Sequence, residues 1–488
     1  MNPIIIAIAV IYLLVCVLIG YWATKKTKTS SDFFVAGRDM GMFVMAIAAF
    51  SSIQSGFGMV GGTGLTFNGG LGFASGLMVS APLGFALAWF LIGKRLYKLS
   101  RLGEVYSIGD IIEIRYQSKA ARGWISVAML LGIMGYLGTQ VQAMGIILHS
   151  IFGVSTMTGA IIGLGIMAFY CVGGGILAAV YTDLFQGVIM IVVSIIVFFI
   201  AIDAGGGITE MTQTLMDSNP SLASPFGAFP VLTVFCWFFM ISLGAAAQPH
   251  FLTKFLLLKN SKDLKWGAFT ASVSYMITTL LVIGIGLAAL VLKIQGKFPD
   301  LNSPDDALTV FLNMFTSPVI NGLVIAGLMS AIMSTGSSFV NIGAASLIRD
   351  IPKAFNIVVK RELFWSRIAV FGLLLISTIF SFYMNTLVGL LGVFGWGMFA
   401  SAIFPPVILG LIWSKATKQG AIGGIVISLI INIVLEIGGK YGMKLLPAGV
   451  VNGAFSLAVS TLFFIVISLL TQPKEEVLSS ELKGVIEG

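Results

Sequence analysis

Apolar residues dominate long stretches of the chain, and short segments rich in Gly, Ser, Lys and Asp separate them. A helix of about 20 apolar residues spans the hydrocarbon core of a bilayer. Such stretches cover residues 4–22, 41–66, 73–93, 123–149, 156–178, 184–204, 229–252, 267–292, 318–347, 366–384, 387–413, 419–438 and 446–471. The pattern therefore predicts an all-α integral membrane protein in which residues 1–488 form a single transmembrane domain of about 13 helices.

Composition and charge agree with this pattern. With 57% hydrophobic and 10% charged residues, the chain is not a soluble globular protein. If the N-terminus lies outside, alternate loops place every Lys and Arg on one side except Lys293, Lys297, Lys440 and Lys444. Because basic loops mark the cytoplasmic side, we expect a multi-pass protein of the plasma (inner) membrane with the C-terminus in the cytoplasm. The basic residues of these cytoplasmic loops, next to the lipid bilayer, account for the net charge of +8, so no nucleic-acid partner is expected.

Two predicted spans contain residues that interrupt a helix. The second carries five glycines within residues 56–64, next to the polar run 51–55. The seventh carries small residues that end in Gln248-Pro249-His250. Broken membrane helices occur where freed carbonyl groups face protein or a wet cavity, and corresponding breaks in two halves mark the site of a secondary transporter. Close helix packing through glycine is the alternative explanation.

The positions of these breaks predict the organisation of the domain. They lie five spans apart, so spans two to six (41–204) and seven to eleven (229–413) would form two repeats. Residues 1–40 would supply the first span and a cytoplasmic loop. Residues 414–488 would supply two extra spans and a cytoplasmic tail.

The ninth predicted span contains a cluster of hydroxyl side chains, at Ser330, Ser334, Thr335, Ser337 and Ser338. With Ala331 one turn earlier, Ser334 and Thr335 point their oxygen atoms at nearly one place, because residues three and four apart share a helix face. Oxygen ligands without a nearby carboxylate suit a weakly held monovalent cation. Close packing of small residues against a neighbouring helix is the alternative.

Acidic residues occur in two different settings. Asp183 stands at the predicted start of the sixth span, where a carboxylate is a functional candidate or, equally, a helix cap. Asp300, Asp305 and Asp306 lie in a polar outer segment, where we expect solvated side chains. No Lys or Arg falls at mid-bilayer, so an anionic solute would depend on N–H groups at a half-helix terminus.

Several separated motifs resemble those of the sodium:solute symporter family. They are Ala36-Gly37-Arg38, the element from Gly173-Gly174-Gly175 through Thr182-Asp183 to Gln186, Gln248-Pro249-His250, and Ala331-Ile332-Met333-Ser334-Thr335. The last two are similar to elements of the sodium–proline and sodium–pantothenate symporters. The resemblance implies a leucine-transporter-type inverted repeat of five plus five helices, with broken helices in spans two and seven. It also implies alternating access coupled to inward sodium movement.

The resemblance further implies a sodium site. Carried over by position, its residues are Ser51, Gln54, Ala331, Ser334 and Thr335, with Asp183 as a candidate on the sodium exit path. Ile53 departs from the family pattern, because the proline symporters place an aspartate there. Gln54 is more polar than the usual residue, which makes its side chain a candidate for solute contact.

Candidate solute contacts come from three spans. Tyr136 and Gln140 share one face of the fourth span, and Tyr136 aligns with a tyrosine implicated in substrate binding in the proline symporter. The candidate set is Gln54, Ser55, Phe57, Tyr136, Gln140, Trp396 and Phe399. For Trp396 and Phe399, aromatic packing between helices is an equally good explanation.

We therefore expect a sodium-coupled secondary active symporter that imports a small organic solute. A carboxylate such as pantothenate or another monocarboxylate is the first candidate, and proline or a sugar is the alternative. The sequence contains no HExxH, nucleophile-elbow, P-loop or metal-ligand pattern, so an enzyme is not expected. An ion channel or a sensor on the same scaffold is the competing class. Sodium is expected as the coupling ion, without a further cofactor.

Overall fold

The computed structural model describes residues 2–262, 264–384, 388–472 and 480–486, and its regular structure is helical throughout these ranges. The first half contains α1 (Pro3–Lys26), α2 (Ser30–Val35), α3 (Met42–Ile53), α4 (Gly62–Gly69), α5 (Gly72–Leu87), α6 (Lys94–Arg101), α7 (Ile108–Tyr116), α8 (Lys119–Phe152), α9 (Thr156–Ala204) and α10 (Ile208–Ser218). The second half contains α11 (Val231–Ala246), α12 (Pro249–Phe255), α13 (Leu264–Ile294), α14 (Ala307–Phe315), α15 (Pro318–Ala345), α16 (Ile351–Ala354), α17 (Glu362–Met384), α18 (Val388–Ile403), α19 (Gly410–Ile412), α20 (Lys418–Lys440), α21 (Asn452–Leu470) and α22 (Ser480–Ile486). Short π- or 3-10-helical segments precede or extend several of these: η1 (Ala36–Arg38), η2 (Phe57–Gly61), η3 (Ala88–Gly93), η4 (Pro220–Ala223), η5 (Pro304–Asp306), η6 (Ser346–Asp350) and η7 (Phe404–Leu409).

The described helices confirm a membrane-spanning bundle but not the expected number of spans. Eleven are long and apolar enough to cross a membrane, and the bent pair Met42–Ile53 and Phe57–Gly69 raises the number to 12. The predicted span 156–178 accounts for the difference: it corresponds to the part of α9 from Thr156 to the bend at Gly175, within which Thr156–Phe169 is grouped with the shorter apolar helices.

α9 bends at Gly175, which has φ 55° and ψ −144°. The sequence pattern predicts the boundary between two spans at residues 179–183, so that prediction is wrong by about one turn. Glycine adopts this backbone conformation without strain, and a Cβ atom here would lie 2.6 Å from the carbonyl oxygen of Phe33. Asp183 therefore lies inside a helix, about two turns beyond the bend, and does not cap it.

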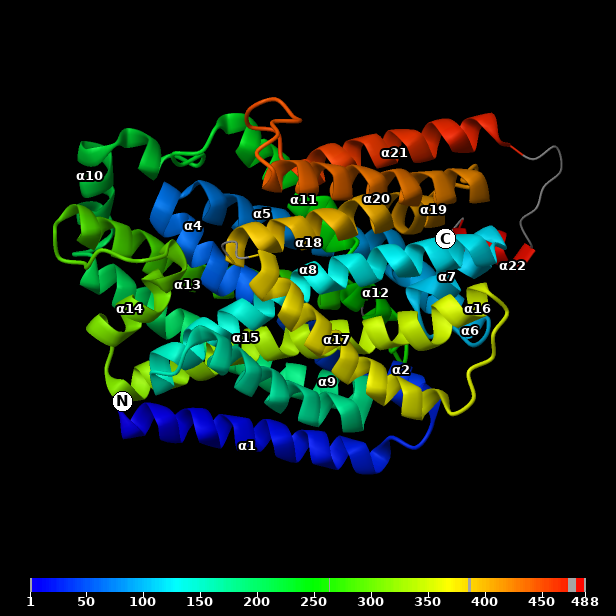
Figure 1. The fold of residues 1–488 in the computed structure, drawn as a ribbon, viewed down its shortest axis with the longest axis horizontal. Coiled ribbons are helices and arrows are strands. Elements are labelled where there is room, and N and C mark those ends of the chain that lie inside the picture. Colours follow the sequence, from blue (N-terminus) through cyan, green and yellow to red (C-terminus); the bar gives the residue numbers. More distant parts are fainter. Residues whose placement is uncertain (1, 263, 385–387, 473–479, 487–488) are drawn as a thin grey trace.

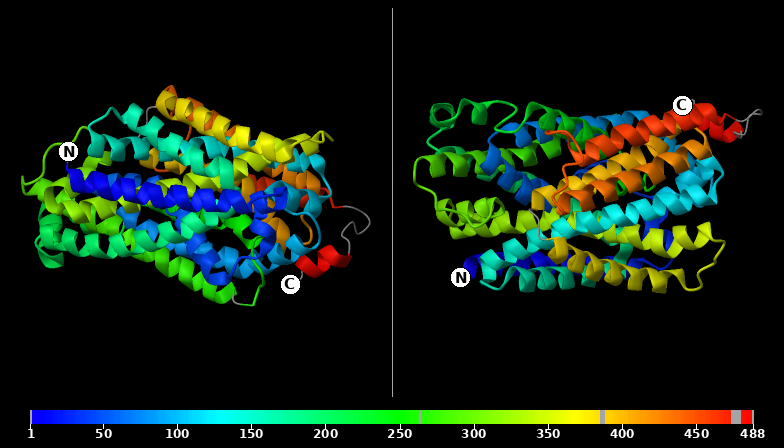
Figure 2. Two further views of the ribbon diagram at one scale, coloured as in Figure 1. Left: turned by 90° about the horizontal axis from the view of Figure 1, so that it is seen from below. Right: turned by 45° about the horizontal axis from the view of Figure 1, so that its top comes forward.

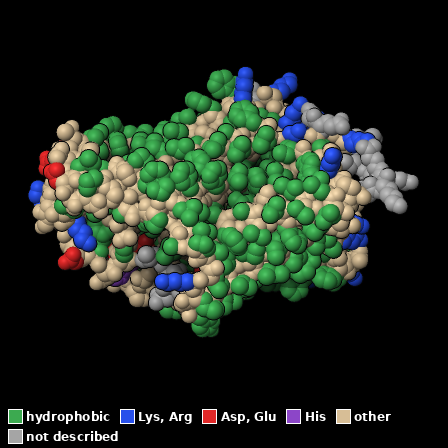
Figure 3. All heavy atoms as spheres, turned by 90° about the horizontal axis from the view of Figure 1, so that it is seen from above, with side chains coloured by type: hydrophobic (Ala, Val, Ile, Leu, Met, Phe, Trp, Pro, Cys, Tyr) green, Lys and Arg blue, Asp and Glu red, His purple; other side chains and the backbone are tan. Residues whose placement is uncertain are grey.

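The long helices run side by side, with α1 at one edge and α20 and α21 at the other (Figure 1). The short helices gather at the two ends, α10 and α14 at one and α2, α6, α7, α16 and α22 at the other (Figures 1 and 2). Hydrophobic side chains cover most of the face between the ends, and many Lys and Arg side chains lie toward the end with α22 (Figure 3). We call this the basic end; it carries Lys26, Lys98, Lys119 and Lys353. An apolar band between two polar ends is the surface that a bilayer requires.

α15 lies at the centre of the bundle. Every residue from Val324 to Ala345 is buried, because this helix packs against α1, α3, α8 and α9. The five hydroxyl side chains in residues 330–338 therefore face protein and not lipid, as polar groups at bilayer depth must.

Both predicted breaks are present and lie in the same region. α3 ends at Ile53, and the chain resumes a helical course at Phe57 at an angle of 54°. α11 ends at Ala246, and α12 begins at Pro249, whose missing N–H is tolerated in the first turn of a helix. Because α12 packs against α3 and α15, the second break faces the first.

Candidate functional site

Oxygen atoms from α3 and α15 converge where α3 is broken. The hydroxyl of Ser334 donates to the carbonyl oxygen of Ser51 at 2.8 Å and to that of Ala331 at 3.2 Å. The hydroxyl of Thr335 donates to the carbonyl oxygens of Ser52, at 2.9 Å, and Gln54, at 3.1 Å. The five residues expected to form the sodium site therefore lie together, and Ser52 contributes a further carbonyl oxygen.

The end of α3 explains why these carbonyl groups are available. The last carbonyl groups of a helix have no N–H partner within it, and Gln54 supplies the last such N–H, to Phe50. The carbonyl oxygens that follow carry the negative end of the helix dipole. Neutral oxygen ligands of this kind, at an unwound helix, hold Na⁺ in secondary transporters. The arrangement can therefore bind a small monovalent cation.

Two side chains of α8 contact the other side of the break. Tyr136 Oη lies 2.9 Å from Ser55 Oγ, and Gln140 Oε1 accepts a hydrogen bond of 2.9 Å from the N–H of Gly56. The i, i+4 spacing of Tyr136 and Gln140 thus places both side chains against the unwound segment, as expected.

The predicted aromatic residues form one cluster around Tyr136. The ring centroids of Phe57 and Trp396 lie 6.1 Å from that of Tyr136, and the centroid of Phe399 lies 6.3 Å away. Phe339 of α15 stacks on Phe399 at 5.2 Å. Sequence reasoning missed Phe339, although it stands one residue after the hydroxyl cluster. All five rings are buried, so they pack between the helices around the break.

Several buried polar groups near the two breaks have no hydrogen-bond partner within the described part of the chain. They are the side-chain amides of Gln54 and Gln248, the indole N–H of Trp396 and the hydroxyl of Ser242. The Trp396 indole nitrogen points at α11, since a Cβ atom on Gly244 would lie 2.3 Å from it. Unpaired buried polar groups are costly and call for an explanation. Contact with a polar ligand is such an explanation.

Gln248 is the main residue that the sequence analysis named without assigning it to the site. It lies in the α11–α12 break, and its amide is fully buried. A glutamine directly before a proline inside an apolar span is the signal that could have identified it. At Gln54 the carbonyl oxygen faces Thr335, while the side-chain amide oxygen lies close to Gly58. Gln54 thus contacts α15 through its backbone and the continuation of the broken helix through its side chain.

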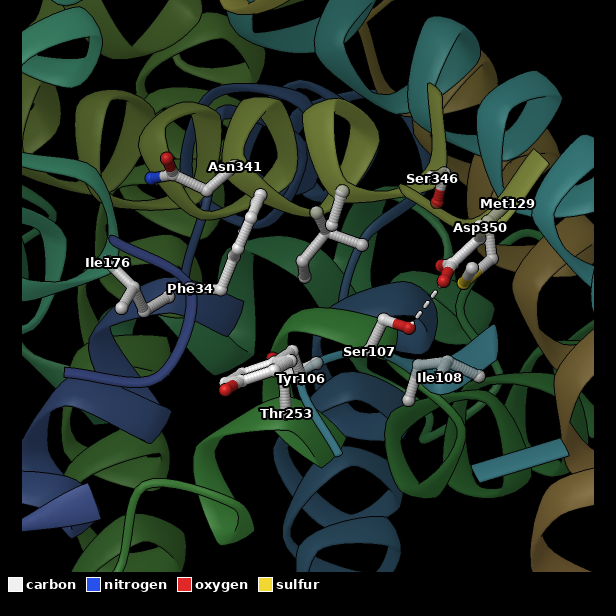
Figure 4. A pocket seen from close by; sticks show the side chains of 12 residues that line it. Phe34, Tyr106, Ser107, Ile108, Met129, Ile176, Thr253, Asn341, Ser346 and Asp350 are labelled. Carbon is white, nitrogen blue, oxygen red and sulfur yellow. Dashed lines mark hydrogen bonds between the residues drawn. The ribbon is translucent and has the colours of Figure 1, made fainter. Parts of the chain in front are cut away.

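A pocket lies between the hydroxyl cluster and the basic end (Figure 4). Asn341 and Ser346, further along the helix from Ser334, line one side, and Thr253 of α12 lines another. The Ser107 hydroxyl donates a 2.7 Å hydrogen bond to Asp350 at its rim. Most of the remaining lining is apolar, with Phe34, Met129 and Ile176 among its residues.

Asp183 forms no hydrogen bond with Ser334 or Thr335 among those of the described residues, and its carboxylate pairs with a lysine instead. Its Oδ2 lies 2.6 Å from Lys254 Nζ, and the two side chains are 0% and 2% exposed. The sequence counts Lys254 among the basic residues of the cytoplasmic side. Its burial was not expected, and it follows from α12 continuing the broken span to Phe255.

Solved structures share the arrangement of helices. A Na⁺-coupled sialic acid symporter in a substrate-bound outward-open state aligns with a TM-score of 0.77 at 18% identity, covering 97% of this chain and 99% of that one. MHP1, a nucleobase-cation-symport-1 family transporter, aligns with a TM-score of 0.54 at 15% identity, covering 94% and 99%. The chain therefore has the leucine-transporter-type fold that its sequence predicts.

Sequence relatives are transporters over nearly the same length. The high-affinity proline transporter PutP of Bacillus subtilis is 27% identical over 95% of this chain and 98% of its own. The sodium/pantothenate symporter of Haemophilus influenzae is 27% identical over 86% and 87%. The family model of the sodium:solute symporters matches residues 33–428, which include both broken helices and the oxygen cluster. This protein is thus a multi-pass membrane transporter and not an enzyme, and it belongs to the sodium:solute symporter family.

Proposed function

We propose that the chain imports a small organic carboxylate together with sodium, by alternating access across the plasma membrane. The single observation that carries this proposal is the convergence of the Ser334 and Thr335 hydroxyls on the carbonyl oxygens of Ser51, Ser52 and Gln54. Family membership supports sodium as the coupling ion. We further propose that the basic end faces the cytoplasm, because basic loops do so in membrane proteins.

The solute class is inferred from the groups that surround the break. Proline and pantothenate, which appear in the names of the relatives, both carry a carboxylate. The amides of Gln54 and Gln248 and the indole N–H of Trp396 are neutral donors without other partners among the described residues. Neutral donors can bind a carboxylate without the desolvation cost of a buried Arg or Lys. A monocarboxylate such as pantothenate is the first candidate. Proline, which carries an amine besides its carboxylate, and a sugar, which could use the same groups, are the alternatives.

Purified protein in proteoliposomes tests this proposal. A panel of labelled pantothenate, lactate, proline and glucose would be offered with an inward sodium gradient and with potassium in its place. We expect concentrative uptake of one carboxylate only with sodium. Uptake that ignores sodium, or accumulation of glucose alone, would contradict the proposal. A channel on the same scaffold would pass ionic current far in excess of labelled solute.

A further inference from the structure

The Lys254–Asp183 ion pair lies close to the proposed sodium site but supplies no ligand to it. Lys254 stands in the last turn of α12, and Asp183 stands inside α9. Their 2.6 Å contact is almost fully shielded from solvent. This ion pair joins α12, the half-helix after the second break, to α9 of the other proposed repeat.

Besides the Lys254 ammonium, one hydroxyl group adjoins the Asp183 carboxylate. Ser338 of α15 lies beside the carboxylate, one turn beyond Ser334. Neither Ser338 Oγ nor Asp183 Oδ1 has a well-formed hydrogen bond within the described residues. The next hydroxyl, Ser337, donates to the carbonyl oxygen of Ser334 at 2.9 Å. A buried carboxylate is costly unless a cation pairs with it or a proton neutralises it, and the unpaired Ser338 and Asp183 oxygens beside each other are suitable ligands for a small cation.

Here the chain itself supplies that cation. The Lys254 ammonium occupies one carboxylate oxygen of Asp183, and a sodium ion at the other oxygen would lie within a few ångströms of a like charge in a medium of low dielectric. Such repulsion is strong. The pair is neutral as a unit, so it adds no charge to the transport cycle.

We propose that Lys254 is a tethered cation that takes the place of a second sodium ion at Asp183, and that it thereby fixes coupling at one sodium ion per cycle. This inference rests on the proposed sodium site at Ser334 and Thr335. It assigns Lys254 a role in stoichiometry, distinct from solute binding. A purely structural ion pair would contribute to folding and leave the number of bound sodium ions unchanged when removed.

Binding of radioactive ²²Na⁺ to the purified full-length protein in detergent, at pH 8 and without any solute, tests the proposal. We expect saturation at one ion per wild-type chain and at two per chain for Lys254→Met, which leaves Asp183 uncompensated. The double variant Lys254→Met with Asp183→Asn should return to one ion, and Lys254→Arg should stay at one. Lys259→Met is the matched control, because Lys259 pairs with Asp39 on the surface, and it should also bind one.

Each outcome has a defined consequence. Wild-type protein that binds two sodium ions overturns the tethered-cation proposal and leaves the proposed function intact. A monodisperse Lys254→Met protein that binds one ion also overturns it. If that variant fails to fold, Lys254→Gln, which also removes the charge and keeps Asp183, takes its place: two ions support the proposal and one overturns it. A double variant that binds no ion shows that the pair belongs to the primary site and also overturns the proposal. Wild-type protein without saturable sodium binding overturns both proposals.

Discussion

The Ser334 hydroxyl lies 2.8 Å from the carbonyl oxygen of Ser51, although 283 positions separate the two residues. Ser51 belongs to the last turn of α3 and Ser334 to the middle of α15. The contact joins the first proposed repeat to the second at the point where a helix ends inside the bundle. A cation held there would therefore couple the two repeats, since its ligands come from both.

Removing a hydroxyl from this contact should weaken sodium activation. We expect Ser334→Ala and Thr335→Ala each to raise the sodium concentration for half-maximal uptake about 5- to 150-fold, corresponding to ~1–3 kcal/mol for one lost buried polar partner. Ser334→Thr and Thr335→Ser should keep most of the affinity because the oxygen atom remains. Sodium titration of uptake in proteoliposomes measures the effect.

Ser330→Ala provides the control for this pair. Ser330 lies one turn earlier on the same helix, but its hydroxyl donates to the carbonyl oxygen of Ala326 within that helix. Its removal should leave sodium activation unchanged. Equal effects of all three alanine substitutions would indicate helix packing and contradict the cation site.

The Tyr136 and Gln140 contacts predict a separable effect on the solute. Tyr136→Phe removes the hydroxyl that contacts Ser55, and Gln140→Ala leaves the Gly56 N–H without its acceptor. We expect both changes to raise the half-saturating solute concentration about 5- to 150-fold, the result of a loss of ~1–3 kcal/mol, and to change sodium activation less. Gln142→Ala is the control, because Gln142 contacts Ser381 instead. A larger effect on sodium than on solute would remove these residues from the solute site.

The sequence predicted the broken helices and the oxygen cluster because both leave local signals. A run of glycines at mid-span lowers helix propensity and a proline removes a helical N–H donor, and the spacing of Ala331, Ser334 and Thr335 places them on one helix face. Their contact with Ser51 and Ser52 follows from the packing of α15 against α3, for which the family resemblance supplied the expectation.

Other features depend on packing that no local pattern encodes. Lys254 is a charged residue in a part of the sequence that resembles a loop. It is buried because α12 continues past the break. Asp305 stands in a polar loop, where the sequence predicts a solvated side chain. It is 5% exposed because η5 folds against α4, with Asp305 Oδ1 close to Gly64. The bend at Gly175 packs closely against Phe33, which lies far away in the sequence.

Gly175→Ala should destabilise the protein through this bend. The alanine would hold a strained backbone conformation, which costs ~1–3 kcal/mol, and its Cβ atom would meet Phe33. Gly165→Ala in the same helix is the matched control, since nothing lies within 4 Å of its Cβ position. We expect a lower thermal unfolding midpoint in detergent for the first variant alone. Equal midpoints would mean that α9 straightens without cost.

Asp305 should make stability depend on pH. Burial raises the pKa of its carboxyl to about 6, the hydrogen bond from the Val388 N–H opposes this in part, and Asp306 raises the pKa further. The folded state therefore favours the protonated form, so its stabilising contribution is complete below about pH 4 and is lost as pH rises to about 6. Relative to Asp305→Asn, wild-type protein should lose up to ~3 kcal/mol over this range. Exposed Asp300→Asn is the control, and parallel curves for wild type and Asp305→Asn would contradict the prediction.

The charge of the solute should decide whether membrane potential drives uptake. One sodium ion carries one positive charge, and the Lys254–Asp183 pair is neutral as a unit. Import of a zwitterion such as proline would then move one net charge, worth about 2.3 kcal/mol or a 50-fold accumulation per 100 mV. Import of a monoanion such as pantothenate would move none. We therefore expect a potassium–valinomycin potential, inside negative, to raise accumulation of a zwitterion at fixed sodium and to leave a monoanion unaffected. A monoanion whose accumulation rises with the potential would require at least two sodium ions per cycle, because one sodium ion balances its charge completely.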